Sequence, residues 1–331
     1  KEALSRPLKL DDREYVVTGS MGIAIYPDDG EDVDILLRNA DIAMYAAKEE
    51  GRNTYRFFSE EMNARMLERL ALESDLRRAL ERDELVLHFQ PQVEALTGKI
   101  VALEALVRWQ HPQRGLLPPL DFIGIAEETG LIIPLGEWVM RAACGQAVAW
   151  REAGFAPMRV SVNVSSRQLT QSDLVTTVKQ VLDATRLAGE YLELELTESS
   201  LMTDVEATTQ TLWGLKETGL SLSVDDFGTG YSSMNYLKRF PLDALKIDRS
   251  FVQDLTVDAN DAAITKAVIA LAKALDLSTV AEGVEEEDQL EFLVDQGCDL
   301  IQGFLISRPI PAEEIGPFIE SRALPEKPSS A

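Results

Sequence analysis

Histidine and cysteine are scarce in this 331-residue sequence, which contains only His88, His111, Cys144 and Cys298. A zinc site built from these residue types is therefore nearly excluded, and so is a mechanism that needs several histidines. No apolar run reaches the roughly 18 residues of a membrane span, and we expect no secretory signal peptide. Two distant, unpaired cysteines suit a reducing compartment, so we expect a cytoplasmic protein.

Positive charge is also in short supply, with 32 lysine and arginine residues against 56 aspartate and glutamate residues. The resulting net charge of −24 repels DNA, RNA and anionic membranes, so we expect no nucleic-acid partner of that kind. A phosphate-bearing substrate would need a local source of positive charge to enter such a protein.

From Asp83 onward the sequence alternates between strand-like and helical segments. Apolar runs predict strands at 85–93, 100–109, 159–164, 191–197, 221–226, 244–248, 278–283 and 299–305. Helical patterns separate them from the second run onward, which predicts an α/β fold of the (β/α)8 barrel type. Only a short turn at Thr97–Gly98 joins the first two strands. A parallel crossover needs more residues, so we expect this pair to be antiparallel.

The residues before Asp83 follow a different pattern. Tyr15–Tyr26 is predicted to be a strand, Val33–Glu50 a helix and Thr54–Phe58 a short strand. The expected organisation is a small α+β fragment at 1–58, a connecting helix at 59–82, a barrel at 83–322 and a loose tail at 323–331.

Charged and amide side chains interrupt the predicted barrel strands near their carboxyl ends, where barrel enzymes carry their chemistry. They are Glu104, Arg108, Asn163, Glu195, Glu198, Asp225, Asp226, Lys246, Asp248, Glu282, Glu285 and Gln302. So many carboxylates in one barrel mouth should not ionise together without cations. Oxygen ligands favour Mg²⁺ or Mn²⁺, and two such ions are a standard device for phosphodiester hydrolysis.

Lys246 admits three roles from the sequence. It could be a Schiff-base nucleophile as in barrel aldolases, a counter-ion for the acids, or a group that orients water and stabilises developing charge. Nearby carboxylates should raise the pKa of Lys246, which disfavours an amine nucleophile. Gln90, at the end of the first strand, could reach a ligand or belong to a loop.

Many motifs resemble those of the EAL family of cyclic di-GMP phosphodiesterases. They include HFQP at 88–91, EALVR at 104–108, SVNVSSRQL at 161–169, ELTES at 195–199, DDFGTGYSS at 225–233, LKIDRSFV at 245–252, AEGVE at 281–285 and QGFLISRP at 302–309. The resemblance runs from about Asp83 to Glu320 and implies a barrel with a reversed first strand. It also implies hydrolysis of cyclic di-GMP to linear 5′-pGpG with two Mg²⁺ or Mn²⁺ ions. The alternative is a catalytically silent cyclic di-GMP receptor that acts through protein contacts.

The resemblance further implies a role for each matching residue. The expected metal ligands are Glu104, Asn163, Glu195, Asp225, Asp226, Asp248 and Glu282, with Asp225 shared by both ions. The expected catalytic residues are Lys246, Glu282 and Glu104, and the expected substrate contacts are Gln90, Arg108, Glu285 and Gln302. Glu198 would anchor the loop after the fifth strand and so couple homodimer formation to metal binding.

The N-terminal residues resemble another family. TGSMGIAIYPDDG at 18–30, ADIAMYAAKEEGRN at 40–53 and YRFF at 55–58 match the C-terminal end of a GGDEF, or diguanylate cyclase, domain. The GGDEF signature is absent, so we do not expect this fragment to make cyclic di-GMP. We expect the chain to be the cytoplasmic part of a larger, membrane-anchored bacterial protein with a sensory region upstream.

Overall fold

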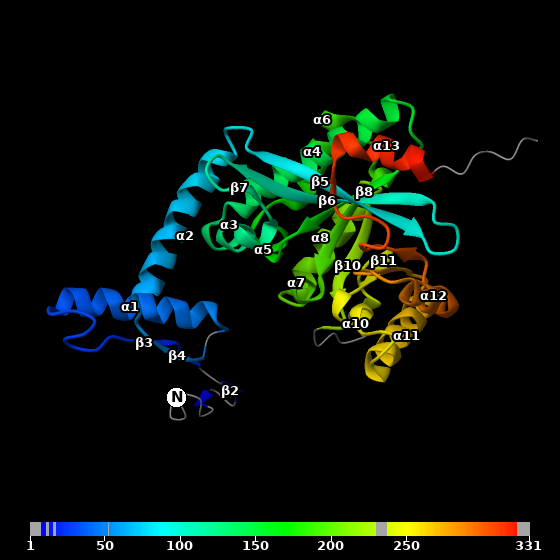
Figure 1. Cartoon of the computed structure of the whole chain (residues 1–331). Helices are drawn as coiled ribbons and strands as arrows, with labels where there is room; N and C mark the ends of the chain where they lie inside the picture. Colours follow the sequence, from blue (N-terminus) through cyan, green and yellow to red (C-terminus); the bar gives the residue numbers. More distant parts are fainter. Residues whose placement is uncertain (1–7, 11–12, 16–17, 52, 230–236, 323–331) are drawn as a thin grey trace, which may run out of the picture. The chain divides into compact units, whose positions relative to one another are not determined.

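The computed structural model describes residues 8–10, 13–15, 18–51, 53–229 and 237–322 (Figure 1). The chain divides into two compact units, Lys1–Leu76 and Arg77–Ala331, and each is described by itself. The predicted loose tail at 323–331 lies outside the described residues. No described helix is long and apolar enough to cross a membrane.

The first unit holds a helix against a small sheet. β3 (Met21–Ile23) pairs in parallel with β4 (Tyr55–Phe57), and α1 (Val33–Glu49) packs against both. A separate hairpin joins β1 (Leu8–Leu10) to β2 (Arg13–Tyr15). The predicted helix over 33–50 and the predicted short strand over 54–58 are thus present.

The predicted strand over Tyr15–Tyr26 is wrong in its length. Among its described residues, Tyr15 ends β2 and Met21–Ile23 form β3, while the residues from β3 to Tyr26 form no strand. A strand persists only while a partner supplies hydrogen bonds, and β4 offers three residues. β3 also lies very close to α1, because a Cβ at Gly22 would stand 1.8 Å from Ala40 O.

Eight described strands of the second unit close into a barrel. In order around the ring they are β5 (Leu85–Glu94), β13 (Leu300–Ile301), β12 (Ser278–Ala281), β11 (Ala244–Ile247), β10 (Ser221–Phe227), β9 (Leu192–Thr197), β8 (Arg159–Val164) and β6 (Ile100–His111). β5 runs antiparallel to both β6 and β13, and the other neighbours run parallel. The predicted barrel with a reversed first strand is therefore confirmed. Two short strands, β7 (Gly115–Leu117) and β14 (Ile310–Pro311), extend β6 and β5.

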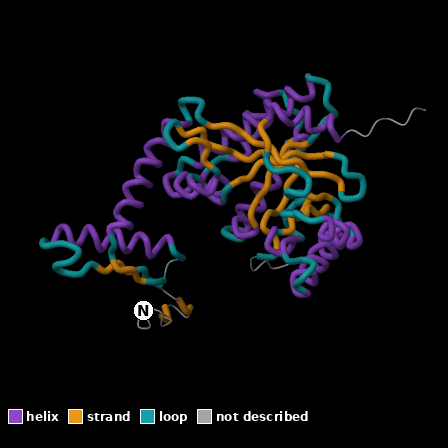
Figure 2. Tube along the Cα trace, in the orientation of Figure 1, coloured by secondary structure: helices purple, strands orange, loops and turns teal. Residues whose placement is uncertain are grey.

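Helices surround these strands (Figure 2). They are α3 (Ile123–Thr129), α4 (Ile132–Glu152), α5 (Ser166–Gln171), α6 (Leu174–Thr185), α7 (Glu198–Leu201), α8 (Val205–Lys216), α10 (Arg249–Gln253), α11 (Ala259–Ala274), α12 (Glu287–Gln296) and α13 (Ala312–Arg322). α2 (Glu60–Ala79) contains the boundary between the two units.

β9 illustrates how one strand serves two different environments. Leu192, Leu194 and Leu196 are fully buried, and each such side chain contributes about 1.5–3 kcal/mol of apolar burial. Glu193 and Glu195 alternate with them and are also buried. Because successive side chains point to opposite faces of a strand, the leucines face the surrounding helices, whereas the acids face the barrel axis.

Some predicted strands end earlier than the sequence suggests. β13 stops at Ile301 instead of 305, because the chain next packs against the backbone of Val284. A Cβ at Gly303 would lie 2.0 Å from Val284 O, and Val284 N donates to Gln302 O. β11 stops before Asp248, whose carboxylate instead caps α10. These turns bring polar residues to the barrel mouth.

Candidate active site

Lys246 lies at the carboxyl end of the barrel and pairs with three carboxylates. Its Nζ is 2.5 Å from Glu195 Oε2, 2.5 Å from Glu282 Oε1 and 3.4 Å from Asp225 Oδ1. The side chains of Lys246 and Glu195 are 1% and 0% exposed. Glu195, Asp225 and Lys246 lie on the neighbouring parallel strands β9, β10 and β11, and Glu282 directly follows β12. Hydrogen bonding between these strands therefore brings the four side chains together.

The surroundings keep Lys246 positively charged. Burial by itself lowers the pKa of this amine, but Asp225, Glu104, Glu195 and Glu282 outweigh that effect and raise its pKa well above the usual value. A Schiff-base nucleophile must be a neutral amine, so the geometry disfavours that role. The ammonium fits the counter-ion and charge-stabilising roles that the sequence also allowed.

Three carboxyl groups of the site hold their protons more tightly than usual. Burial is the largest cause in each case: it raises the pKa of Glu282 to about 8, that of Asp226 to about 6, and that of Glu195 well above its ordinary value. Repulsion from neighbouring acids adds to burial, while Lys246 pulls in the opposite direction. The site therefore carries more acidic groups than one ammonium can neutralise.

A network of amides holds the carboxylate of Glu104 from both sides. Asn163 Nδ2 donates to Glu104 Oε1 at 2.7 Å, and Gln302 Nε2 donates to Glu104 Oε2 at 2.5 Å. Gln302 Nε2 also lies 3.1 Å from Gln90 Oε1, and Gln92 Nε2 donates to Gln302 Oε1 at 2.8 Å. Gln92 was not among the residues predicted from the sequence. Its signal was its spacing, since it follows Gln90 by two residues and so shares the same strand face.

Asp225 and Asp226 are consecutive, yet both lie in the site. The register between β10 and β11 shifts between Val224 and Phe227, a bulge of the kind that redirects side chains. Asp226 adopts a positive φ of 55°, and its side chain hydrogen-bonds to that of Asp248. Asp226 and Asp248 thus form a second carboxylate pair beside the Lys246 cluster.

Arg108 and Glu285 make contacts outside this cluster. Arg108 Nη1 donates to Val107 O, and burial lowers the pKa of the guanidinium while the attraction of Glu104 opposes that shift. Glu285 Oε1 lies 3.1 Å from Arg249 Nη2. Gln90 Nε2 donates to Ser307 O. All three predicted substrate contacts beyond Gln302 therefore have protein partners in this conformation.

Glu198 fixes the start of the loop after β10. Its Oε2 accepts a hydrogen bond from Gly228 N at 3.0 Å, and Glu198 is almost completely buried at the beginning of α7. Gly228 has a φ of 101°, a conformation that favours glycine. The predicted anchoring residue thus contacts the predicted loop directly.

The donor set of the site fits a hard divalent cation. Its donors are carboxylate and amide oxygens, and Glu195 Oε1 is buried with no hydrogen-bond partner among the described residues. Within the described part of the chain, however, no three His, Cys, Asp or Glu side chains stand in an arrangement that could hold an ion. The carboxylates are directed instead to Lys246 and to the amides of Asn163 and Gln302. An ion would need some of these acids to exchange one partner for another.

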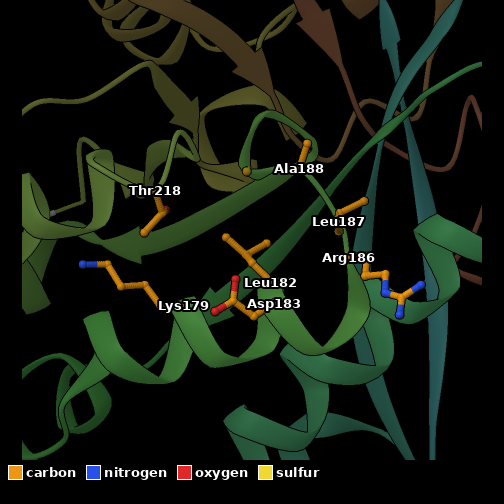
Figure 3. A pocket seen from close by; sticks show the side chains of 8 residues that line it. Lys179, Leu182, Asp183, Arg186, Leu187, Ala188 and Thr218 are labelled. Atoms are coloured by element: carbon orange, nitrogen blue, oxygen red, sulfur yellow. The ribbon is translucent and has the colours of Figure 1, made fainter.

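A surface hollow of about 500 Å³ lies elsewhere on the second unit (Figure 3). It is lined by Lys179, Leu182, Asp183, Arg186, Leu187, Ala188, Gly189 and Thr218. Most of these residues belong to α6 or to the connection from α6 to the amino end of β9. The acidic site lies instead at the carboxyl ends of the barrel strands. None of the residues predicted from the sequence lines this hollow.

Two family models match the chain. The EAL domain matches residues 73–309, and the diguanylate cyclase, GGDEF domain, matches residues 1–54. Both matches agree with the resemblances found in the sequence.

Curated relatives and solved structures give the same result. The bifunctional diguanylate cyclase/cyclic di-GMP phosphodiesterase MucR of Pseudomonas aeruginosa is 48% identical over 312 residues, which are 94% of this chain and 46% of MucR. The cyclic di-GMP phosphodiesterase PdeR of Escherichia coli is 44% identical over 93% of this chain and 46% of its own. The chain therefore spans less than half the length of these relatives. The solved PaMucR phosphodiesterase, in a c-di-GMP complex, has a TM-score of 0.72 and 49% identity, covering 74% of this chain and 99% of that one.

Proposed function

This chain belongs to the EAL domain family, and we propose that it is a metal-dependent phosphodiesterase that opens cyclic di-GMP to linear 5′-pGpG. The observation that carries this proposal is the pairing of one buried ammonium, Lys246, with Glu195, Glu282 and Asp225 at the barrel mouth. Such a site suits a reaction in which negative charge develops on a phosphate. The names of MucR and PdeR support the choice of substrate.

The resemblance to the EAL family assigns the metal-binding residues, and their oxygen donors suit a hard divalent cation. Glu104, Asn163, Glu195 and Asp225 would hold one ion, and Asp226, Asp248 and Glu282 would hold a second that shares Asp225. Mg²⁺ or Mn²⁺ bound there would supply an acidified water and positive charge beside the phosphate. The unpaired Glu195 Oε1 and the raised pKa of Glu282 support this assignment, because both indicate a shortage of positive charge.

The other side chains of the site have separate roles in the proposed reaction. Lys246 keeps its proton and stabilises negative charge on the attacking water and on the phosphate oxygens. Gln302 and Asn163 orient the carboxylate of Glu104 through the hydrogen bonds described above. Arg108, Gln90 and Glu285 contact the nucleotide, with the Arg108 guanidinium supplying attraction for phosphate.

The wider setting of the reaction is also part of the proposal. The chain acts as a homodimer through the barrel domain, with the Glu198–Gly228 hydrogen bond linking the loop after β10 to the site. It acts in the cytoplasm, where the two buried free cysteines, Cys144 and Cys298, stay reduced. A sensory region in the longer protein supplies the regulatory signal.

Nucleotide chromatography tests the proposed function. The chain is incubated with cyclic di-GMP and Mg²⁺, with and without a chelator. We expect pGpG to form only when the metal is present. Folded protein that binds cyclic di-GMP but yields no pGpG in either Mg²⁺ or Mn²⁺ would instead indicate a silent receptor.

A further inference from the structure

The interior of the barrel contains buried polar atoms that no side chain satisfies. Among the described residues, the buried side-chain N and O atoms without a hydrogen bond are Gln92 Oε1, Arg159 Nε, Ser161 Oγ, Glu195 Oε1 and Ser223 Oγ. Arg159 Nε still has a charge partner, because it lies 2.7 Å from Glu193 Oε2. Glu195 Oε1 belongs to the proposed metal ligands. Gln92, Ser161 and Ser223 remain, and all three are 0% exposed.

Each of these three residues lies two positions from a site residue on the same strand face, toward the amino ends of the parallel strands: Ser161 from Asn163, Ser223 from Asp225 and Gln92 from Gln90 on antiparallel β5. On β5, Gln92 lies two residues from Gln90 and shares its strand face, because side chains alternate along a strand. Ser161 pairs in register with Glu104. Ser223 pairs in register with Glu195. Ser161 and Ser223 are therefore ladder neighbours of site carboxylates, whereas Gln92, paired in register with Ala102, is connected to the site through its own strand and through Gln302.

Buried, unsatisfied polar residues such as these three are unusual in a barrel interior. Barrel interiors are normally filled by branched apolar side chains, and buried polar atoms almost always have a hydrogen-bond partner. A buried water makes about three hydrogen bonds to such groups, and proteins contain roughly one buried water per 27 residues. Hydroxyls and a carbonyl that face the same narrow interior are the partners that such waters need.

We propose that ordered water occupies the barrel interior beneath the carboxylate cluster, bound by Gln92, Ser161 and Ser223, and that these three side chains position the site above them. A water that donates to Gln92 Oε1 fixes that amide with Nε2 toward Gln302 Oε1, 2.8 Å away. Gln302 then directs its own Nε2 at Glu104 Oε2. The hydrogen bonds thus run in one direction, from the water through two amides to the carboxylate.

Ser161 and Ser223 act on the neighbouring acids in the same way. Each hydroxyl holds a water beside the strand position of Glu104 or Glu195, and this water limits the rotation of the carboxylate. The three residues touch neither substrate nor metal, so they are positioning residues. Their effect on turnover rests on the proposed hydrolysis, whereas the presence of the waters does not.

A crystal structure of the chain at a resolution that reveals ordered water tests the first part. We expect a water about 2.7–3.2 Å from Ser161 Oγ, from Ser223 Oγ and from Gln92 Oε1. One water can serve more than one of these atoms. An interior that is dry at any of the three atoms overturns the proposal.

Ser161→Ala and Ser223→Ala test the second part. Each variant should lose its water and lower kcat about tenfold with KM unchanged, the size of effect seen when supporting groups of a metal site are removed. Ser278→Ala is the matched control. The Ser278 hydroxyl donates directly to Asp243 O at 2.9 Å, so its loss should lower the unfolding temperature and leave kcat unchanged.

Parental kcat in both Ser161→Ala and Ser223→Ala would overturn the positioning role. If the parent chain itself shows no turnover, the proposed function fails, and the crystal structure still decides whether the waters are present.

Discussion

Lys246 Nζ lies 2.5 Å from Glu195 Oε2, and both side chains are almost completely buried inside the barrel. An ion pair withdrawn from water in this way is strongly destabilising when one partner is removed, because the other charge stays buried. Asp225 and Glu282 share the same ammonium. Removing either partner of this ion pair should therefore affect both the stability of the barrel and the activity of the site.

Replacing Lys246 should affect both properties. Lys246→Met should abolish turnover and lower the free energy of unfolding of the metal-free chain by about 3–5 kcal/mol. Chemical denaturation and the nucleotide assay measure the two effects. Adding Glu195→Gln to the Lys246→Met variant should recover part of the stability and none of the turnover. A Lys246→Met chain as stable as the parent would refute this dependence.

The stability of the metal-free chain should fall as the pH rises. Folded Glu282 keeps its proton up to about pH 8, whereas the unfolded chain loses it near the ordinary pKa of 4.5. Between these values the folded state binds more protons, so the free energy of unfolding decreases with increasing pH. Denaturant unfolding in chelator at several pH values measures the slope.

A comparison with one variant isolates this contribution of Glu282. Burial lowers the pKa of His88, which gives a slope of opposite sign below the ordinary histidine pKa of 6.5, so the parent is compared with Glu282→Gln. From pH 5 to 8 the free energy of unfolding of the parent should fall relative to that of Glu282→Gln. A constant difference would mean that Glu282 has an ordinary pKa in the folded chain.

Glu104 should be essential for turnover but not for folding. Glu104→Ala removes the carboxylate that Asn163 and Gln302 hold, and turnover should fall by more than about 100-fold, beyond the loss typical of supporting groups. Circular dichroism should be unchanged. Glu94→Gln is the control: Glu94 is the last residue of β5, its carboxylate accepts an exposed hydrogen bond from Thr97, and the variant should keep full activity. An active Glu104→Ala enzyme would exclude this carboxylate from the site.

The Glu198 contact predicts a local change in amide exchange. Glu198→Ala removes the acceptor for Gly228 N–H, so this amide should exchange faster with solvent. Glu198→Gln keeps an acceptor oxygen and should retain protection. Hydrogen exchange followed by NMR resolves this single amide. Equal exchange in the two variants would show that the hydrogen bond does not hold the loop.

Most of the barrel could be predicted from the sequence, because its strands are apolar runs with clear boundaries. The short turn at Thr97–Gly98 was enough to predict the antiparallel pair that the register of Gln90 with Glu104 confirms. The strand over Tyr15–Tyr26 could not be predicted correctly, since its β-branched residues carry no information on how short its partner is. The pairing of β14 with β5 was also missed, because a two-residue strand leaves no pattern in the sequence.

The candidate site was predicted as a set of residues and not as a network. Charged residues at strand ends are visible in a sequence, so Lys246, Glu195 and Glu282 were found. That one ammonium contacts three acids depends on strand order and register, which only the fold supplies. Gln92, Ser161 and Ser223 were missed because a buried glutamine or serine in a strand resembles an ordinary polar residue until its neighbours are known.

The most direct test of the proposed function is ³¹P NMR of cyclic di-GMP mixed with the chain and Mg²⁺. Hydrolysis of one phosphodiester converts two equivalent diester phosphorus atoms into one diester and one monoester. We predict that the monoester signal of pGpG grows with Mg²⁺ and is absent with chelator or with Glu104→Ala. A spectrum that retains only diester phosphorus, from folded protein with bound cyclic di-GMP and Mg²⁺ or Mn²⁺, would contradict the account.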